Sequence, residues 1–243
     1  MAQNIYDDPE FFAGYRQLRR SVEGLAGAPE WPTLQALLPA MRGLKVVDLG
    51  CGFGWFARWA VERGAAQVLG LDVSDNMLAE ARQRTSSAAI TYEKADLAAL
   101  TLPRALFDLA YSSLAFHYVE DAGRLYAQIH QALRPGGGLV FSTEHPVYMA
   151  AANARWMTDS NGRKTWPVND YFTEGRRVSH WLTNGVVKYH RTIGTTLSLL
   201  LQCGFKIEHV EEFCPTAEQI AADPSLAEER ERPMFLLVSA RRL

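Results

Sequence analysis

A short apolar run leads into a glycine-rich turn and then into an amphipathic segment, and this order constrains the fold more than any other feature. Residues 45–49 (KVVDL) have the composition of a buried strand, the turn contains Gly50, Gly52 and Gly54, and a helix is expected over 55–63. Glycines permit turn dihedrals that other residues avoid, and their missing side chains let a ligand lie against the backbone. The feature therefore predicts a strand, loop and helix that bind a ligand.

Apolar segments of strand length alternate with amphipathic segments of helix length along most of the chain. We expect strands at 45–49, 67–72, 90–94, 107–112, 139–143, 205–213 and 234–241. Helical patterns occupy 9–40, 55–63, 74–84, 121–133 and 193–201, and Ser74 is a good N-cap. Pro135-Gly136-Gly137 is expected to end the fourth of these, and Gly204 the last. This alternation predicts a doubly wound α/β fold with a mostly parallel sheet covered on both faces.

The rhythm of strands and helices stops after Glu144 and resumes near residue 193. Between these points, two strand-like runs at 177–182 and 186–193 flank Asn184-Gly185, a typical hairpin turn. We interpret 145–192 as an inserted cap over the carboxyl edge of the sheet, where ligands bind in open α/β folds. The expected organisation is one domain, with a helical segment 1–43, a cofactor-binding core 44–144, the cap, and a C-terminal helix and strands 193–243.

Acidic residues stand at the ends of three successive expected strands. Asp72 ends the second strand, where a carboxylate can accept both hydroxyl groups of a ribose. Asp48 lies on the first strand, where it would repel a pyrophosphate but suit a ligand with an ammonium and a sulfonium group. Asp96 follows the third strand and is well placed to bind an adenine amino group. Turn capping would explain Asp48 or Asp96 alone, but the set of three indicates a ligand site.

The glycine spacing separates two classes of enzyme. A nucleotide-dependent oxidoreductase would have the pattern G-x-G-x-x-G, whereas this chain has G-x-G-x-G followed by Trp55. This spacing and Asp48 count against the oxidoreductase. A non-catalytic or regulatory protein with the same fold stays open, because fold alone does not define function. Aminopropyl transfer from the same cofactor is a further alternative that nothing in the sequence demands.

Five stretches resemble the class I S-adenosylmethionine methyltransferases, in the small-molecule group that includes ubiquinone- and biotin-pathway enzymes. They are VVDLGCGFGWFARWA, VLGLDVSDNMLAEAR, KADLAAL, FDLAYSSLAFHYVED and LRPGGGLVFSTEHP, within residues 45–146 and in the family's order. The flanking YDDPEFFAGY, YHRTIGTTLSLLLQCGF and FLLVSA are similar more loosely. The resemblance implies S-adenosylmethionine as cofactor and a seven-stranded sheet whose last strand is antiparallel.

The resemblance also implies roles for individual residues. Gly50 and Gly52 would lie along the methionine part of the cofactor, Asp72 would hold the ribose, and Asp96 with Leu97 would frame the adenine. Ser112, Ser113 and Leu114 would pass beneath the methionine and sulfonium, and Tyr15 would close over the methionine carboxylate. Cys51 is interpreted as a small loop residue without a nucleophilic role. The other cofactor contacts expected are Asp48, Val73 and Met77.

Methyl transfer chiefly requires that acceptor, methyl and sulfur lie in line. A base is needed only when the acceptor must lose a proton. The candidate catalytic residues are His117 and His145, which follow the fourth and fifth strands, and His190 in the cap; Tyr118 and Tyr148 are further candidates. The sequence leaves the choice open.

The acceptor is expected to be a small molecule. The fourth strand lacks the Asn/Asp-Pro-Pro-Tyr run typical of enzymes that methylate adenine or glutamine amides. Aromatic residues of the cap would line a pocket for a flat or apolar molecule, or only attach the cap or form a dimer face: Trp156, Trp166, Tyr171, Phe172 and Trp181. Basic residues of the cap would suit an acidic substrate or form a solvated face: Arg155, Arg163, Lys164, Arg176, Arg177, Lys188 and Arg191.

Composition bounds the remaining possibilities. The net charge of −2 gives no support for a nucleic-acid partner. No apolar run is long enough to cross a membrane, and the N-terminus has no secretory signal. Three widely spaced cysteines favour a reducing, cytoplasmic location. No metal-ligand spacing is evident, since His209 and Cys214 lack a second compact pair; a homodimer is a possible assembly.

Overall fold

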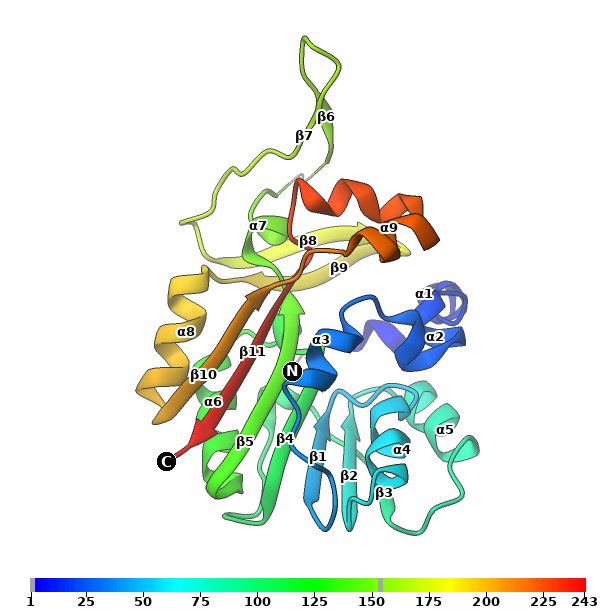
Figure 1. Cartoon of the computed structure of the whole chain (residues 1–243), viewed down its shortest axis with the longest axis vertical. Helices are drawn as coiled ribbons and strands as arrows, with labels where there is room; N and C mark the ends of the chain where they lie inside the picture. Colours follow the sequence, from blue (N-terminus) through cyan, green and yellow to red (C-terminus); the bar gives the residue numbers. More distant parts are fainter. Residues whose placement is uncertain (1–2, 153–154) are drawn as a thin grey trace.

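A computed structural model describes residues 3–152 and 155–243 of the chain (Figure 1). Its centre is a seven-stranded sheet in the order β10-β11-β5-β4-β1-β2-β3, in which β11 runs antiparallel to both neighbours and the other pairs are parallel. The strands are β1 (Lys45–Leu49), β2 (Gln67–Asp72), β3 (Ile90–Lys94), β4 (Phe107–Ser113), β5 (Leu133–Glu144), β10 (Phe205–Glu212) and β11 (Phe235–Arg242). The predicted α/β sheet with an antiparallel last strand is confirmed.

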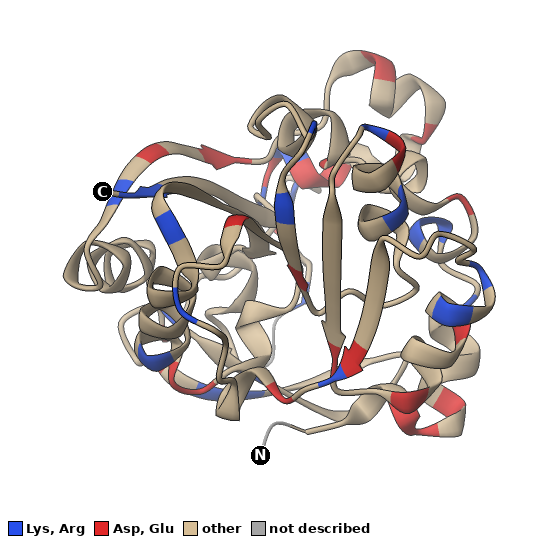
Figure 2. Ribbon diagram, turned by 90° about the horizontal axis from the view of Figure 1, so that it is seen from below, with Lys and Arg blue, Asp and Glu red and all other residues tan. Residues whose placement is uncertain are grey.

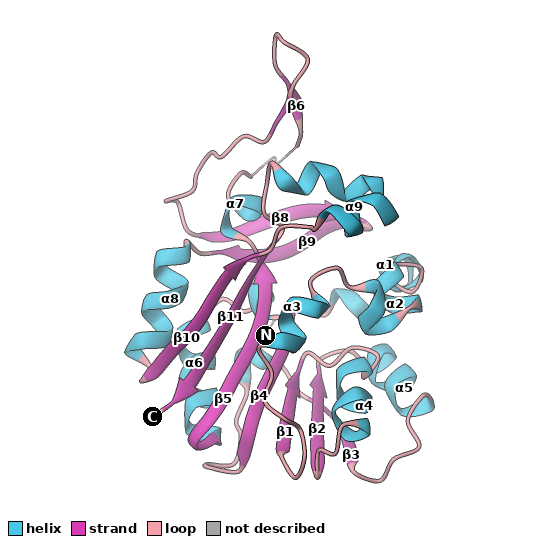
Figure 3. Ribbon diagram, in the orientation of Figure 1, coloured by secondary structure: helices cyan, strands magenta, loops and turns pink. Residues whose placement is uncertain are grey.

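Helices cover both faces of this sheet (Figure 3). The α-helices are α1 (Pro9–Tyr15), α2 (Arg19–Val22), α3 (Trp31–Ala36), α4 (Trp55–Glu62), α5 (Asp75–Gln83), α6 (Ala122–Ala132), α7 (Pro146–Met149), α8 (Ile193–Gln202) and α9 (Ala217–Ala222). Short 3-10 helices are η1 (Ile5–Asp7), η2 (Gly24–Gly27), η3 (Leu97–Ala99), η4 (Phe116–Tyr118) and η5 (Pro224–Arg230). One face packs against α3, α4 and α5, and the other against α6 and α8.

The alternation of side chains along β1 explains why two layers form. Val46 belongs to the core beneath α3, α4 and α5, whereas Val47 and Leu49 belong to the core beneath α6 and α8, and all three are at most 1% exposed. Successive side chains of a strand point to opposite faces. Burying each side chain contributes roughly 1.5–3 kcal/mol, so the central strand stabilises both layers at once.

The strand order creates a ligand crevice. β1 pairs with β2 on one side and with β4 on the other, so the chain winds in opposite directions from β1. Loops after such strands diverge, and ligands bind at this point of open α/β sheets. The glycine loop after β1 and the segment after β4 therefore meet at the carboxyl ends of the strands.

The N-terminal segment lies over these carboxyl ends and is anchored to α5. Ser74 is the N-cap of α5, as predicted, and its Oγ accepts from the N–H of Met77 at 3.1 Å. The Asp7 carboxylate adds a second cap, because it accepts from the Ser74 hydroxyl at 2.5 Å and from the N–H of Asn76 at 3.1 Å. A carboxylate at a helix N-terminus is stabilising, so these contacts fix the N-terminal segment above β2.

Residues 145–192 contain a separate hairpin of β8 (Gly175–Trp181) and β9 (Thr183–His190), and a small arm of β6 (Met157–Thr158) and β7 (Lys164–Thr165). In Figure 1 both lie beyond the carboxyl ends of the central strands. The hairpin packs on the N-terminal segment, where Val186 and Trp181 contact Phe11, Tyr6 and their neighbours.

Two local predictions were wrong. The hairpin turn is at Leu182, whose φ is 60°, because Trp181 pairs with Thr183; Asn184-Gly185 forms an irregularity on the β9 side. Pro135-Gly136-Gly137 does not separate α6 from a later strand, since α6 ends at Ala132 and β5 begins at Leu133. Pairing with β4 continues through a register shift that contains these residues, between Leu133 and Gly138, which is how a sheet accommodates proline and glycine.

Candidate active site

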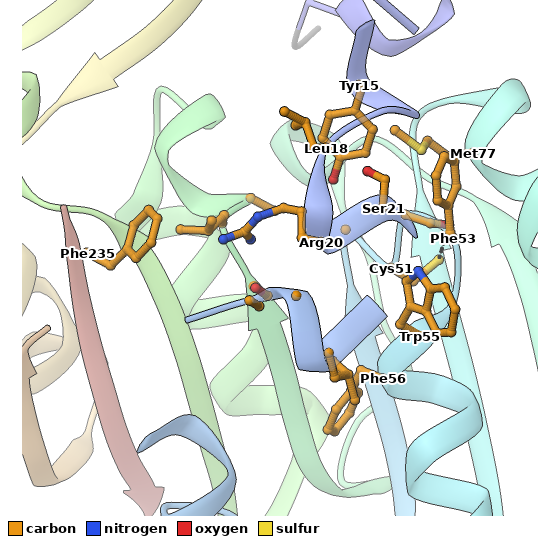
Figure 4. Close-up of a pocket in the computed structure, with 18 of the residues that line it drawn as sticks. Tyr15, Leu18, Arg20, Ser21, Cys51, Phe53, Trp55, Phe56, Met77 and Phe235 are labelled. Carbon is orange, nitrogen blue, oxygen red and sulfur yellow. Dashed lines mark hydrogen bonds between the residues drawn. The ribbon is translucent and has the colours of Figure 1, made fainter. Parts of the chain in front are cut away.

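A cavity of about 630 Å³ lies above the carboxyl ends of β1, β2 and β4 and beneath the N-terminal segment. It is lined by twelve residues that the sequence assigns to the cofactor, namely Tyr15, Asp48, Gly50, Cys51, Gly52, Asp72, Val73, Met77, Asp96, Leu97, Ser113 and Leu114. Figure 4 shows Tyr15, Leu18 and Arg20 entering this cavity from the N-terminal segment. The fold thus brings the predicted cofactor residues together.

The glycine loop has the backbone that its sequence predicts. Gly50, Gly52 and Gly54 have φ values of 76°, 50° and 70°, which other residues rarely adopt. A Cβ at Gly50 would lie 2.5 Å from the Cβ of Ala115, whereas a Cβ at Gly52 would meet no atom within 4 Å. Gly50 is therefore required for packing against the segment after β4, and Gly52 leaves open space beside the loop.

The Asp72 carboxylate is fixed by backbone donors from two loops. Its Oδ2 accepts from the N–H of Gly52 at 2.9 Å, and its Oδ1 accepts from the N–H of Ser74 at 3.0 Å. Burial raises the pKa of Asp72, although these hydrogen bonds oppose the shift. Such a rigid acceptor at the end of β2 suits a hydroxyl-rich ligand such as a ribose.

Asp48 provides a buried acidic group for which the described residues supply no cation. It is 2% exposed, and among the described residues no group donates to its Oδ2. Burial, followed by the charge of Asp72, raises the pKa of Asp48 to about 8. An unpaired buried acid costs free energy until a donor or cation reaches it, so the site is suited to a positively charged ligand such as one with an ammonium and a sulfonium group.

The remaining predicted cofactor residues on the cavity wall come from η3, α5 and the glycine loop. Asp96 is the N-cap of η3 and its Oδ1 accepts from the N–H of Ala98 at 2.9 Å, so the carboxylate caps a turn as well as lining the cavity. Leu97 is buried beside it, and Met77 comes from the first turn of α5. Burial, followed by the charges of Asp72 and Asp48, raises the pKa of the Cys51 thiol well above the usual value. A protonated thiol is a poor nucleophile, in agreement with the role assigned to Cys51.

The predicted serines after β4 differ in position. Ser113 and Leu114 line the cavity, and Leu114 has a positive φ of 54°. Ser112 is fully buried, and its hydroxyl donates to the carbonyl oxygen of Leu49 at 2.7 Å. Ser112 therefore joins β4 to β1 beneath the site and does not line it.

The N-terminal segment contributes aromatic rings and one cation that sequence reasoning missed. Tyr6 lies edge-on to Tyr15, and its hydroxyl is 3.2 Å from that of Tyr118. Arg20 pairs with the fully buried Glu30 at 3.0 Å and lies over the ring of Phe235 at 5.6 Å, toward which it points in Figure 4. No periodic pattern marks these residues, because their role depends on how the segment docks.

His117 is the one predicted catalytic histidine on the cavity wall among the described residues. Burial lowers its pKa to about 4, so the ring is neutral at pH 7. Its Nδ1 accepts from the N–H of Glu144 at 3.3 Å, which places the ring proton on Nε2. The neutral ring can therefore donate a hydrogen bond from Nε2 at the cavity wall.

His145 and His190 lie off the described lining of the cavity. The Nδ1 of His145 accepts from the N–H of Val147 at 3.0 Å at the start of α7, and its Nε2 contacts Glu212 at 2.8 Å. The Nε2 of His190 donates to the carbonyl oxygen of Tyr171 at 2.8 Å. These contacts give both side chains structural functions in attaching the cap.

The predicted aromatic residues of the cap differ in position, and so does one of its basic residues. Trp181 lines the cavity, whereas Trp156 and Trp166 pack around Arg232 and attach the arm, and Phe172 is 90% exposed. Among the basic residues, Lys188 is not part of a solvated face, because it is only 4% exposed. It reaches inward from β9, where burial alternates along the strand.

Known proteins that are similar in sequence and structure agree with this geometry. Residues 47–141 match the family model described as a methyltransferase domain. The S-adenosylmethionine-dependent methyltransferase from Mesorhizobium loti is 64% identical, covers 90% of this chain and 100% of its own, and superimposes with a TM-score of 0.88. An uncharacterized protein of Haemophilus influenzae is 34% identical over 99% of this chain and 97% of its own length. A malonyl-[acyl-carrier protein] O-methyltransferase of Enterobacter lignolyticus is 42% identical over 45% of this chain and 43% of its own.

The chain therefore belongs to the S-adenosylmethionine-dependent methyltransferases, as the sequence indicates, and S-adenosylmethionine is its cofactor. Among residues 3–152 and 155–243, no group of three His, Cys, Asp or Glu side chains is arranged to hold a metal ion. None of the helices described in the structure has the length and apolarity needed to cross a membrane.

Proposed function

We propose that this methyltransferase acts on a small molecule, through an oxygen, nitrogen or carbon nucleophile, by in-line displacement. One observation carries the proposal: all the predicted cofactor residues except Ser112 share a single cavity with Tyr118, Tyr148 and Trp181. A pocket of this size with aromatic walls is typical of small-molecule sites. An acceptor on these rings would lie next to the cofactor without leaving the cavity.

The cofactor-binding residues keep the roles inferred above. Asp72 holds the ribose hydroxyls, Asp96 and Leu97 frame the adenine, and Val73 and Met77 complete that wall. Gly50 and Gly52 accommodate the methionine part, beside which Asp48 offers the unpaired Oδ2 to a cation. Tyr15 closes the site from above.

The bound cofactor supplies an activated methyl group on a sulfonium, so the protein chiefly aligns and shields the reactants. The acceptor atom forms a bond to the methyl carbon while the carbon–sulfur bond breaks, and that electron pair stays on sulfur. Rigid elements such as Leu114, held by a hydrogen bond from its N–H to the carbonyl oxygen of Ser142 at 3.0 Å, define where the acceptor can approach.

Small-molecule acceptors fit the surface better than nucleic acid does. Lys and Arg residues lie among Asp and Glu residues around the molecule in Figure 2. A nucleic-acid substrate generally requires a basic face. The cytoplasmic location and the homodimer stay predictions.

A labelling experiment tests this function. The purified protein is incubated with methyl-labelled S-adenosylmethionine and a metabolite extract, and labelled products are separated by size and identified by mass. We expect label in a small molecule with wild type and none with Asp72→Ala, which removes the ribose acceptor. Label found only in protein or RNA of the extract would contradict a small-molecule acceptor.

A further inference from the structure

A buried carboxylate with one unused oxygen lies at the carboxyl end of β5. Glu144 lines the cavity, and its side chain is 13% exposed. Its Oε1 accepts from the Lys188 ammonium at 2.5 Å, whereas its Oε2 is buried and has no partner among the described residues. Leaving a buried carboxylate oxygen unpaired is costly, so this oxygen requires a donor that the chain does not supply.

The surroundings keep Glu144 ionised and rigid. Burial alone would raise its pKa, but protonated His117 and the charge and hydrogen bond of Lys188 outweigh burial and hold the pKa of Glu144 below its usual value. Lys188 is enclosed by the rings of Trp181 and Tyr118, whose centroids lie 5.3 Å and 6.0 Å from Nζ. The Nε2 of His117 is 3.9 Å from Oε1. The Lys188 ammonium and the His117 ring thus both face Oε1, and Oε2 has no partner among the described residues.

Glu144 stands on the acceptor side of the cavity. On the neighbouring strands, Ser142 pairs with Ser113, and their hydroxyl oxygens are 3.4 Å apart. Ser113 and Leu114 mark the position proposed for the methionine and sulfonium, and Glu144 follows Ser142 by two residues on β5. The carboxylate therefore lies near the position proposed for the reacting centre, and it lines the cavity together with Tyr118, Tyr148 and Trp181.

We propose that Oε2 of Glu144 accepts a hydrogen bond from the reactive O–H or N–H group of the acceptor, so that the enzyme methylates protic nucleophiles and rejects carboxylates. This inference rests on the proposed function. As the acceptor atom bonds to the methyl carbon and the sulfur takes back its electron pair, the acceptor's proton passes to Glu144 and then to solvent. A carboxylate acceptor would bring a like charge to Oε2 with no donor between them, which is unfavourable.

Ligand binding tests the inference without turnover. Benzyl alcohol and benzoate have the same ring but opposite hydrogen-bonding character, and their binding to the S-adenosylhomocysteine-saturated protein can be compared by ligand-observed NMR. We expect benzyl alcohol to bind at least about tenfold more tightly than benzoate, and Glu144→Gln to abolish this preference. Equal or tighter binding of benzoate to wild type, or binding of neither compound, overturns the inference.

Turnover provides the second measurement, in the labelled extract. We expect the product to be an ether or an N-methyl amine, and Glu144→Gln to lower its rate of formation at least about tenfold. The affinity for S-adenosylhomocysteine is expected to stay unchanged, and the exposed Glu62→Gln serves as the matched control. If Glu144→Gln loses cofactor binding through misfolding, Glu144→Asp replaces it and is expected to keep the preference for benzyl alcohol.

The two proposals fail in different ways. A methyl ester as product, or full activity of Glu144→Gln on a protic acceptor, overturns the role of Glu144 and leaves the small-molecule function intact. Label confined to macromolecules overturns the proposed function, whatever the NMR preference shows.

Discussion

The backbone N–H of Gly52 donates a 2.9 Å hydrogen bond to Oδ2 of Asp72, which joins the loop after β1 to the end of β2. The other carboxylate oxygen is held by the N–H of Ser74 at 3.0 Å, at the start of α5. One side chain therefore fixes the relative positions of two loops that line the cavity. Cofactor binding and local stability depend on the same contacts.

Asp72→Asn tests whether this position requires a carboxylate or only a polar side chain. An amide has one oxygen, so its NH₂ group must face one of the two backbone donors, at a cost of about 1–3 kcal/mol. We expect a lower melting temperature and at least about tenfold weaker S-adenosylhomocysteine binding by calorimetry. The exposed Asp75→Asn is the control, with an expected change within about 0.5 kcal/mol; equal effects of the two variants would contradict the role of Asp72.

Gly50→Ala tests the contact between the glycine loop and Ala115. The new Cβ would lie 2.5 Å from that of Ala115, in addition to the strain of a positive φ. Gly43 has a similar φ of 78° but nothing within 4 Å of an added Cβ, so Gly43→Ala reports backbone strain alone. We expect Gly50→Ala to cost about 1–3 kcal/mol more in chemical unfolding, the usual effect of overpacking, and comparable losses would refute the steric argument.

The strands, helices and acidic strand ends follow from the sequence because they depend on local patterns. Residues 45–49, 67–72 and 90–94 are strands with the predicted bounds, since apolar composition and short links define them. Parallel pairing then places Asp48, Asp72 and Asp96 at the carboxyl ends of neighbouring strands, and this placement does not depend on the position of the cap. The cofactor half of the site could therefore be predicted before the structure was known.

The acceptor half depends on contacts between distant segments and leaves little trace in the sequence. Lys188 reaches Glu144 only because the β8-β9 hairpin folds over β5, and 44 residues separate the two side chains. Val186, Lys188 and His190 are buried in alternation along β9. The sequence does not show this alternation, because apolar residues occupy both faces of the segment and a basic residue among other basic residues indicates a solvated face. The position of the turn at Leu182 likewise reflects packing on Phe11 and its neighbours, which overrides the preference of Asn184-Gly185.

Asp48 makes the stability of the ligand-free protein dependent on pH. Its pKa rises from 3.8 to about 8 on folding, so the native state retains a proton that the unfolded chain releases. The free energy of unfolding therefore decreases as the pH rises from about 4 to about 8. We expect Asp48→Asn to lessen this decrease, so that its stability relative to wild type improves with pH in urea titrations; parallel curves would show that Asp48 does not contribute.

The two histidines after β4 and β5 should respond differently to substitution. His117 lines the cavity beside Glu144, so His117→Ala is expected to lower methyl transfer by at least about tenfold and leave cofactor affinity unchanged. His145 binds Val147 and Glu212 outside the lining, so His145→Ala is expected to lower the melting temperature more than the turnover number. Steady-state kinetics and thermal unfolding of both variants check this, and a larger loss of turnover in His145→Ala would reverse the assignment.

Arg232 attaches the arm of the cap to the C-terminal segment. Its guanidinium lies 4.0 Å from the ring centroid of Trp166 and 4.4 Å from that of Tyr148, and pairs with Glu229 at 2.6 Å while being only 6% exposed. Arg232→Met keeps most of the volume but leaves Glu229 unpaired and removes the cation from the rings, which together cost about 3–5 kcal/mol when the pair is buried. We expect faster hydrogen exchange in residues 155–170 with that variant, and no change with Arg163→Met, because Arg163 is 67% exposed.

Since Tyr148 also lines the cavity, weaker binding of benzyl alcohol should accompany the loosened arm. Unchanged exchange in Arg232→Met would mean that other contacts hold the cap in place.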